Sequence, residues 1–170
     1  MPLTRSMPLT RRALLLAATA ALAPRAAAAA QLVEIWKLRG CGCCTLWARH
    51  LEAQGFSTRT SEHADLAPIR ARLGIPEALA GCHSARLADL SIEGHVPALA
   101  IRRLLADRPQ WVRGLAVPGM PAGSPGMPSP TPERYDVLAF GTGGRVERFM
   151  TFVGERPVRA ARSSKRPAGP

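Results

Sequence analysis

Three of the four cysteines in this 170-residue chain form one cluster, Cys41-Gly42-Cys43-Cys44, directly after a short apolar run. The fourth, Cys82, stands beside His83. A Cys-x-x-Cys step after a strand is typical of a thiol redox pair or of half a metal site. Thiolate and imidazole together are the donors that a soft metal ion prefers. The residues predict metal binding, with thiol redox chemistry and structural disulfides as alternatives.

Cys41, Cys44 and Cys82 are the expected primary ligands, with His83 next. Positions 41 and 44 are three apart and share one face of a helix, so both thiols can turn toward the same partner. Cys43 is a lesser ligand candidate, because it is one position off that face and we expect it to point elsewhere unless the loop bends. It also fits the role of a small buried hydrophobic side chain.

His95, Met120 and Met127 are lesser ligand candidates. Thioether sulfur suits Cu(I), but methionine also fills gaps in a core. A histidine between Gly94 and Val96 equally fits a turn or a role behind the ligands. The stretch 114–127, which holds both methionines, is dense in glycine and proline and predicts a long loop. Long ordered loops are usually functional, and this one has the length to cover the cysteines.

Periodicity and turn residues give an order of elements that positions these groups. Strands are expected at 32–38, 56–60, 85–87, 90–92, 135–140 and 145–152, and helices at 45–54, 65–73 and 97–107. Gly141-Thr142-Gly143-Gly144 is a hairpin signal between the last two strands. The order indicates an α/β fold of thioredoxin or glutaredoxin type, a mixed sheet with flanking helices plus a C-terminal β-hairpin.

The cysteine cluster falls where the first strand meets the first helix. A helix N-terminus lowers the pKa of a cysteine there and favours the thiolate, which is both nucleophile and metal ligand. Redox enzymes of this fold usually place a cis-proline opposite the cysteine pair. Here Cys82-His83 falls in that region, whereas Pro97 comes later and opens a helix. This difference favours a metal site over disulfide exchange.

Residues 1–30 have the pattern of a cleaved signal peptide, with arginines, an apolar stretch from 13 to 23 and small residues near Ala30. Arg11-Arg12 resembles a twin-arginine signal, although an arginine pair also occurs by chance in the general secretory route. We expect a periplasmic mature chain from about Gln31, without a membrane span. In that oxidising compartment, thiols are held in disulfides, by metals or by partners.

The formal net charge of +11 is unevenly distributed. Four arginines lie in the leader and five basic residues in the segment 156–170, which contains no acid. Residues 31–155 therefore hold 14 basic and 12 acidic side chains. This balance argues against nucleic-acid binding, which needs a basic patch on the folded domain. We expect one metal-binding domain over 31–155 and a basic disordered tail over 156–170.

Four motifs in order resemble the exported bacterial family catalogued as domain of unknown function 411. They are Cys-Gly-Cys-Cys, Cys-His, Ile-Glu-Gly-His-Val-Pro-Ala, and Gly-Leu-Ala-Val-Pro-Gly-Met-Pro-x-Gly-Ser-Pro-Gly-Met. The resemblance covers about residues 33–152 and implies a thioredoxin-like fold and a role in handling metal, with copper usually suggested. Pro128 departs from the pattern, where an acidic residue is commoner.

Together these observations predict a periplasmic protein that binds Cu(I), with Zn²⁺ as the competing ion. Copper buffering, resistance or delivery to a copper-handling or cuproenzyme partner would be its role, rather than catalysis. The alternative is a thiol-disulfide oxidoreductase that uses Cys41 and Cys44. No Ser-His-Asp arrangement or carboxylate pair stands out in the sequence to indicate a hydrolase.

Overall fold

The computed structural model describes residues 30–158. The predicted signal peptide and all of the predicted tail beyond residue 158 lie outside the described residues. The strands are β1 (Leu32–Leu38), β2 (Ser57–His63), β3 (His83–Leu87), β4 (Leu90–Glu93), β5 (Val112–Ala116), β6 (Arg134–Gly141), β7 (Val146–Val153) and β8 (Arg156–Pro157). The helices are α2 (Gly42–Ala53), α3 (Ala67–Leu73) and α4 (Ala98–Asp107), with short 3₁₀ turns η1 (Glu77–Leu79) and η2 (Thr142–Gly144).

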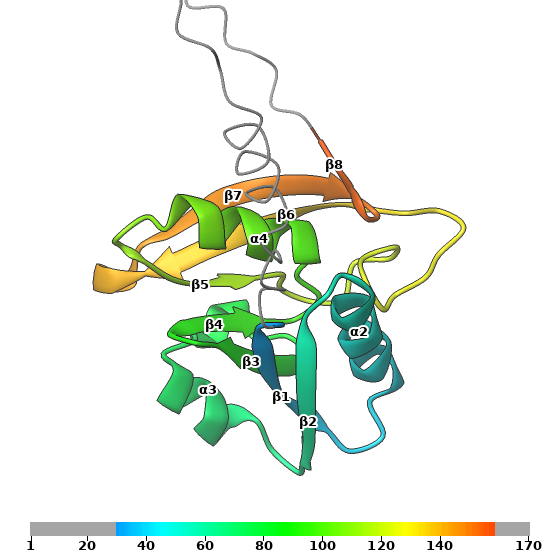
Figure 1. The fold of residues 1–170 in the computed structure, drawn as a ribbon, viewed down its shortest axis with the longest axis horizontal. Coiled ribbons are helices and arrows are strands. Elements are labelled where there is room, and N and C mark those ends of the chain that lie inside the picture. Colours follow the sequence, from blue (N-terminus) through cyan, green and yellow to red (C-terminus); the bar gives the residue numbers. More distant parts are fainter. Residues whose placement is uncertain (1–29, 159–170) are drawn as a thin grey trace, which may run out of the picture.

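All eight strands belong to one sheet, in the order β2-β1-β3-β4-β5-β6-β7-β8 (Figure 1). β1 pairs with β2 and β4 pairs with β5 in parallel, and the remaining neighbours are antiparallel. The prediction of an α/β fold with a mixed sheet is therefore confirmed. None of the helices in residues 30–158 has the length and apolar character needed to cross a membrane.

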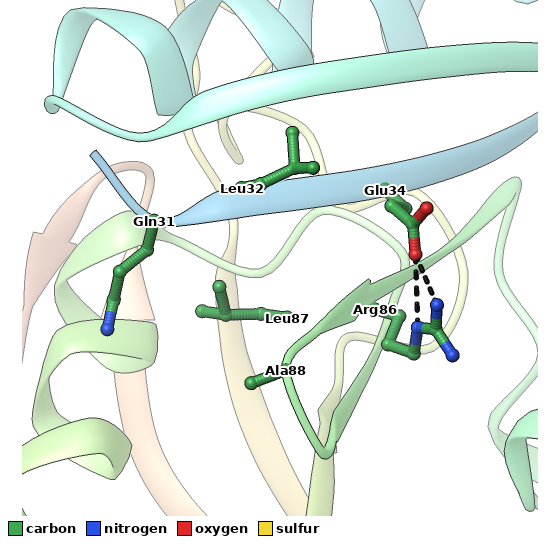
Figure 2. A pocket seen from close by; sticks show the side chains of 6 residues that line it. All are labelled: Gln31, Leu32, Glu34, Arg86, Leu87 and Ala88. Carbon is green, nitrogen blue, oxygen red and sulfur yellow. Dashed lines mark hydrogen bonds and ion pairs between the residues drawn. The ribbon is translucent and has the colours of Figure 1, made fainter. Parts of the chain in front are cut away.

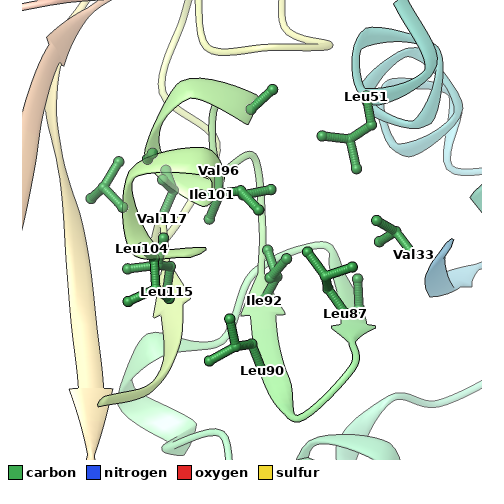
Figure 3. Packing of buried hydrophobic residues seen from close by; sticks show 14 of the residues in the cluster. Val33, Leu51, Leu87, Leu90, Ile92, Val96, Ile101, Leu104, Leu115 and Val117 are labelled. Atoms are coloured by element: carbon green, nitrogen blue, oxygen red, sulfur yellow. The ribbon is translucent and has the colours of Figure 1, made fainter. Parts of the chain in front are cut away.

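Apolar side chains cover both faces of the sheet. The larger cluster includes Leu115 of β5 together with buried residues of α2 and α4 (Figure 3). The smaller cluster contains Ala116 and Phe140, with Ile75 and Leu79 from the segment between α3 and β3. Because successive strand residues point to opposite faces, Leu115 and Ala116 show that the two clusters lie on opposite sides of the sheet.

Strand β5 corrects the sequence interpretation, which assigned Gly114 to the start of a long loop. Gly114 instead lies in the strand between β4 and β6. A Cβ at this position would lie 2.2 Å from the Ser91 carbonyl oxygen and 2.4 Å from the Phe140 ring. Only glycine fits this close approach of neighbouring strands. In the sequence, the same glycine resembles a residue of a loop.

Several element ends differ from the prediction. Helix α2 begins at Gly42 rather than Thr45, so Cys43 and Cys44 lie in its first turn. β3 begins at His83 rather than Ala85, because residue 83 already pairs with Lys37 of β1. β8 occupies the first two residues of the predicted disordered tail. Helix ends and edge pairings depend on neighbouring segments more than on local sequence.

Candidate metal centre

Helix α2 presents three cysteines at its N-terminus. Cys41 is the N-cap residue, with φ −70° and ψ 96°, and Cys44 is fully buried in the first turn. The structure joins Cys41 and Cys44 in a disulfide, with a Cα–Cα distance of 5.5 Å. The two thiols predicted to face one partner therefore face each other, and they become available as ligands only after reduction of this bond.

Cys43 does not point away from the others, as its spacing predicted. Its Sγ lies 3.5 Å from Sγ of Cys41 and 4.0 Å from Sγ of Cys82. The expectation assumed that Cys41 is helical, whereas ψ of 96° takes its side chain out of the helical progression. Cys43 is thus a member of the sulfur group formed by Cys41, Cys43, Cys44 and Cys82.

Cys82 lies where two groups of donor atoms meet. It directly precedes β3, and its Sγ is 3.7 Å from Sγ of Cys44. On its other side, its Sγ is 2.9 Å from Nε2 of His95 and 3.4 Å from Nδ1 of His83. Cys82, His83 and His95 form a second group of possible ligands, so Cys82 is shared by both.

Both histidines of the second group are fully buried. The His83 ring lies 4.3 Å from the Trp47 ring and 5.0 Å from the His95 ring, centroid to centroid. The Trp47 indole N–H donates to the Val96 carbonyl at 2.9 Å, which holds the indole against this site. Nε2 of His83 is buried and has no hydrogen-bond partner among the described residues. An unpaired buried nitrogen costs free energy unless a ligand uses it.

Hydrogen bonding assigns the tautomer of His95. Its Nδ1 lies 2.7 Å from the Pro125 carbonyl oxygen, which can only accept, so Nδ1 carries the proton. In a neutral ring, Nε2 then presents its lone pair toward Cys82. Metal-binding histidines typically donate their second ring N–H to a carbonyl or carboxylate in this manner. His95, a lesser candidate in the sequence, therefore has the geometry of a ligand.

Burial sets the protonation states of the site. Desolvation raises the pKa of Cys82 to about 12, and the neighbouring Cys43 adds to this effect. Desolvation also lowers the pKa of His83 well below its usual value, with a smaller contribution from His95, and lowers the pKa of His95. The imidazoles are thus neutral at physiological pH, the state in which histidine binds metals. Metal-free Cys82 is a thiol.

The glycine- and proline-rich segment 117–127 packs against this site. A Cβ on Gly126, whose φ is +86°, would lie 2.6 Å from the Cys43 carbonyl oxygen. Together with the bond from His95 to Pro125, this contact places the segment over the N-terminal turn of α2. Met120 is 56% exposed and Met127 is half-buried. The two closely spaced donor groups consist of cysteine and histidine, and the assignment of Met120 and Met127 as ligands stays a prediction.

The remaining histidines lie outside the donor groups. The Ala98 N–H, at the start of α4, donates to Nε2 of His50 at 3.2 Å, so His50 caps that helix. Nε2 of His63 lies 3.0 Å from the Ser61 hydroxyl on the edge strand β2. Sequence reasoning missed two other contributors, Trp47 and Glu93. Trp47 packs against the His83 ring, and Glu93 accepts a hydrogen bond from the Gly81 N–H next to Cys82.

The pocket in Figure 2 is a separate feature at the N-terminal end of β1. Its lining residues are Gln31, Leu32, Glu34, Arg86, Leu87 and Ala88. The Arg86 guanidinium donates to the Glu34 carboxylate there. The residues that line this pocket offer no sulfur or imidazole donor. The cysteine cluster lies beyond the opposite, C-terminal end of β1.

Comparisons with known proteins identify a family and similar solved structures. Residues 79–127 match the model of a family described as "Protein of unknown function, DUF411". Two solved structures, both described as copper resistance protein copG, are each 34% identical to this chain. Form 2 has a TM-score of 0.68 and covers 72% of this chain and 98% of its own. Form 1 has a TM-score of 0.69, and the match covers 74% of this chain and 99% of the copG chain.

A comparison with curated proteins finds no match. The matched family segment contains Cys82, His83 and His95, and the copG structures align over nearly their whole length. Two solved structures similar to this chain are named for copper resistance. This chain therefore belongs to the DUF411 family.

Proposed function

We propose that this chain binds copper as Cu(I), at the site centred on Cys82, and buffers it or passes it to a partner protein in the periplasm. One observation carries the proposal. Sγ of Cys82 faces Nε2 of His95 at 2.9 Å, while the other nitrogen of His95 is tied to a backbone carbonyl. A thiol and an oriented imidazole lone pair thus converge in a partly buried place.

The residues present fit a soft metal ion. Thiolate sulfur and neutral imidazole nitrogen are donors that Cu(I) prefers. Cys82, His83 and His95, whose donor atoms lie close together, would hold copper. Cys41, Cys43 and Cys44 would add sulfur ligands once the disulfide is reduced. Zn²⁺ is the competing ion because it accepts the same nitrogen and sulfur ligands.

The strand pairing supports a thioredoxin-like assignment for the first half of the domain. β1 lies between parallel β2 and antiparallel β3, and β4 continues the sheet after β3. The predicted signal peptide supports export, and the similarity to proteins named for copper resistance supports copper as the cargo. A copper-handling or cuproenzyme partner is part of the same proposal.

The test is a competition titration of the reduced chain with Cu(I) against a chromophoric chelator, with Zn²⁺ in parallel. We expect tight Cu(I) binding that outcompetes Zn²⁺. Cys82→Ser should lose more affinity than Cys43→Ser, because Cys82 belongs to both donor groups and Cys43 to one. Equal affinity of the Cys82→Ser variant and the wild type would refute this site.

The disulfide between Cys41 and Cys44 favours a second candidate, a thiol-disulfide oxidoreductase. In that reaction a partner dithiol would supply two electrons and two protons, leaving two thiols here and a disulfide on the partner. Insulin reduction in the presence of dithiothreitol separates the candidates. An oxidoreductase would keep its turnover in the Cys82→Ser variant and lose it in Cys41→Ser, whereas a copper carrier would show no turnover above background in either.

A further inference from the structure

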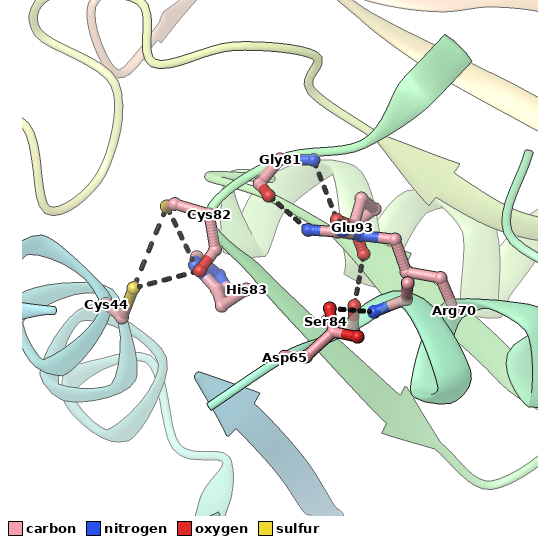
Figure 4. Close-up of polar contacts among 9 residues, drawn as sticks. Cys44, Asp65, Arg70, Gly81, Cys82, His83, Ser84 and Glu93 are labelled. Carbon is pink, nitrogen blue, oxygen red and sulfur yellow. Dashed lines mark hydrogen bonds and ion pairs between the residues drawn. The ribbon is translucent and has the colours of Figure 1, made fainter. Parts of the chain in front are cut away.

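Glu93, the last residue of β4, is a fully buried carboxylate. Its Oε1 accepts from Nε of Arg70 at 2.8 Å and from the Gly81 N–H at 2.7 Å. Its Oε2 accepts from the Ser84 hydroxyl at 2.5 Å (Figure 4). A buried charge is costly unless it is paired and hydrogen-bonded, and these contacts meet that requirement.

The pair formed by Glu93 and Arg70 binds both polar atoms of one backbone residue. Glu93 accepts the Gly81 N–H, and Nη2 of Arg70 donates to the Gly81 carbonyl at 2.5 Å. That carbonyl belongs to the peptide bond that joins Gly81 to Cys82. The two side chains therefore fix the orientation of the backbone immediately before the central thiol.

Glu93 is also close in the chain to His95. His95 follows Glu93 by two positions, and the Gly94 N–H between them donates to the His83 carbonyl at 2.9 Å. A Cβ on Gly81 would lie 2.9 Å from the Gly94 Cα, so the two segments touch through their backbones. The backbone of Glu93 is thus two residues from His95, and its side chain bonds to the residue before Cys82.

We propose that Glu93, with Arg70, is a positioning residue that holds the Cys82 thiol against the His95 imidazole. This inference rests on the proposed copper site and explains the acid of the Ile-Glu-Gly-His motif. Glutamine has nearly the same shape and its amide oxygen can accept at one site, but its NH₂ group cannot accept the bond that Oε2 takes from the Ser84 hydroxyl, and the negative charge that pairs with Arg70 is lost. Removal of one partner of a buried ion pair also destabilises a fold, so the test needs a readout besides stability.

The test compares Glu93→Gln with Ser91→Ala in the full chain. Ser91 is a buried polar residue of the same strand, and its hydroxyl donates to the Leu73 carbonyl at 2.8 Å, away from Gly81. Loss of an outer partner of a metal site typically lowers metal affinity about 10–100-fold. We expect Glu93→Gln to lose Cu(I) affinity in that range and Ser91→Ala to stay within about 3-fold of the wild type.

A second readout needs no metal. In the reduced metal-free chain, iodoacetamide labelling followed by peptide mass spectrometry gives separate rates for Cys82 and Cys43. Glu93→Gln should change the rate at Cys82 several-fold relative to Cys43, and Ser91→Ala should leave the ratio at the wild-type value. A purely structural contribution of Glu93 would change thermal stability without changing this ratio.

Wild-type Cu(I) affinity and a wild-type labelling ratio in a folded Glu93→Gln protein would overturn the inference. If this variant does not fold, Arg70→Lys replaces it, because lysine keeps the charge and cannot bind both Glu93 and the Gly81 carbonyl with one planar group. An absence of Cu(I) binding in the wild type would refute the proposed function, and the labelling ratio alone would then decide whether Glu93 positions Cys82.

Discussion

Two regions of the domain bury different kinds of side chain. The donor region, residues 32–97, holds six of the seven buried polar or charged side chains of the described chain, namely Lys37, His83, Ser84, Ser91, Glu93 and His95. The scaffold region, residues 112–157, holds the remaining one, Ser124. Buried polar groups cost free energy unless they are paired. Their concentration in residues 32–97 shows that polar groups replace apolar side chains in the interior of the donor region.

The scaffold region is instead built from apolar contacts and close glycine approaches. Phe152 and Tyr135 stack with ring centroids 5.9 Å apart, and Gly114 lets β5 fit between its neighbours. If the two regions have separate roles, substitutions in the scaffold should change stability and substitutions in the donor region should change copper affinity. The following predictions test this separation, from the largest expected effect to the smallest.

Phe152→Ala should lower the free energy of unfolding by about 3–5 kcal/mol, because Phe152 is fully buried and loss of its ring leaves a cavity. Urea unfolding followed by circular dichroism measures the loss. The control Val153→Ala, at a neighbouring position that is 40% exposed, should cost about 0.5 kcal/mol or less. Under conditions where the variant is folded, its Cu(I) affinity should equal that of the wild type. A large loss of affinity would show that the two regions are not separable.

Gly126→Ala tests the segment of the scaffold region that packs against the donor region. A side chain at φ of +86° costs about 1–2 kcal/mol. The new Cβ would also meet the Cys43 carbonyl oxygen at 2.6 Å, and such overpacking costs a further ~1–3 kcal/mol. Gly119→Ala is the matched control, since its φ is +71° and nothing lies within 4 Å of the new Cβ. Equal losses of stability in the two variants would contradict the packing of this segment on α2.

His95→Ala should lower Cu(I) affinity by at least the 10–100-fold typical of an outer partner, or about 1.4–2.7 kcal/mol. The reason is that Nε2 of His95, at 2.9 Å, is nearer to the Cys82 thiol than Nδ1 of His83, at 3.4 Å. The competition titration measures this change, with His63→Ala on the edge strand as the control. A Cu(I) affinity of His95→Ala equal to that of His63→Ala would remove His95 from the ligand set.

Tyr135→Phe should cost about 1 kcal/mol, because the phenol donates to the Gly154 carbonyl at 2.8 Å. Burial raises the pKa of Tyr135 above its usual value near 10. The folded chain therefore keeps this proton while the unfolded chain loses it, so wild-type stability should fall as the pH rises above about 10. Unfolding at pH 8 and pH 10.5 should show a smaller decrease in the variant. Parallel decreases in both proteins would contradict a buried, protonated Tyr135.

The sequence determined the donors and the order of most elements around them. The apolar run 32–38 became β1 with the predicted bounds, and the cysteines fell at the start of α2. These features depend on periodicity, turn residues and helix starts, which are local properties of the chain. The identity of the soft donors was equally readable, because it requires only the residue types.

The predicted fold type placed Cys82-His83 opposite the cysteine pair, but tertiary structure decided the particular contacts among the donors. β1 pairs with β3 across about fifty residues, and this pairing brings Cys82 to α2. The Pro125 carbonyl gives His95 its tautomer, and Glu93 bonds to Gly81 twelve positions away. β5 was missed because its glycine is explained only by the strand beside it. Contacts between distant segments form when sheet pairing brings them together, and no local pattern in the sequence encodes them.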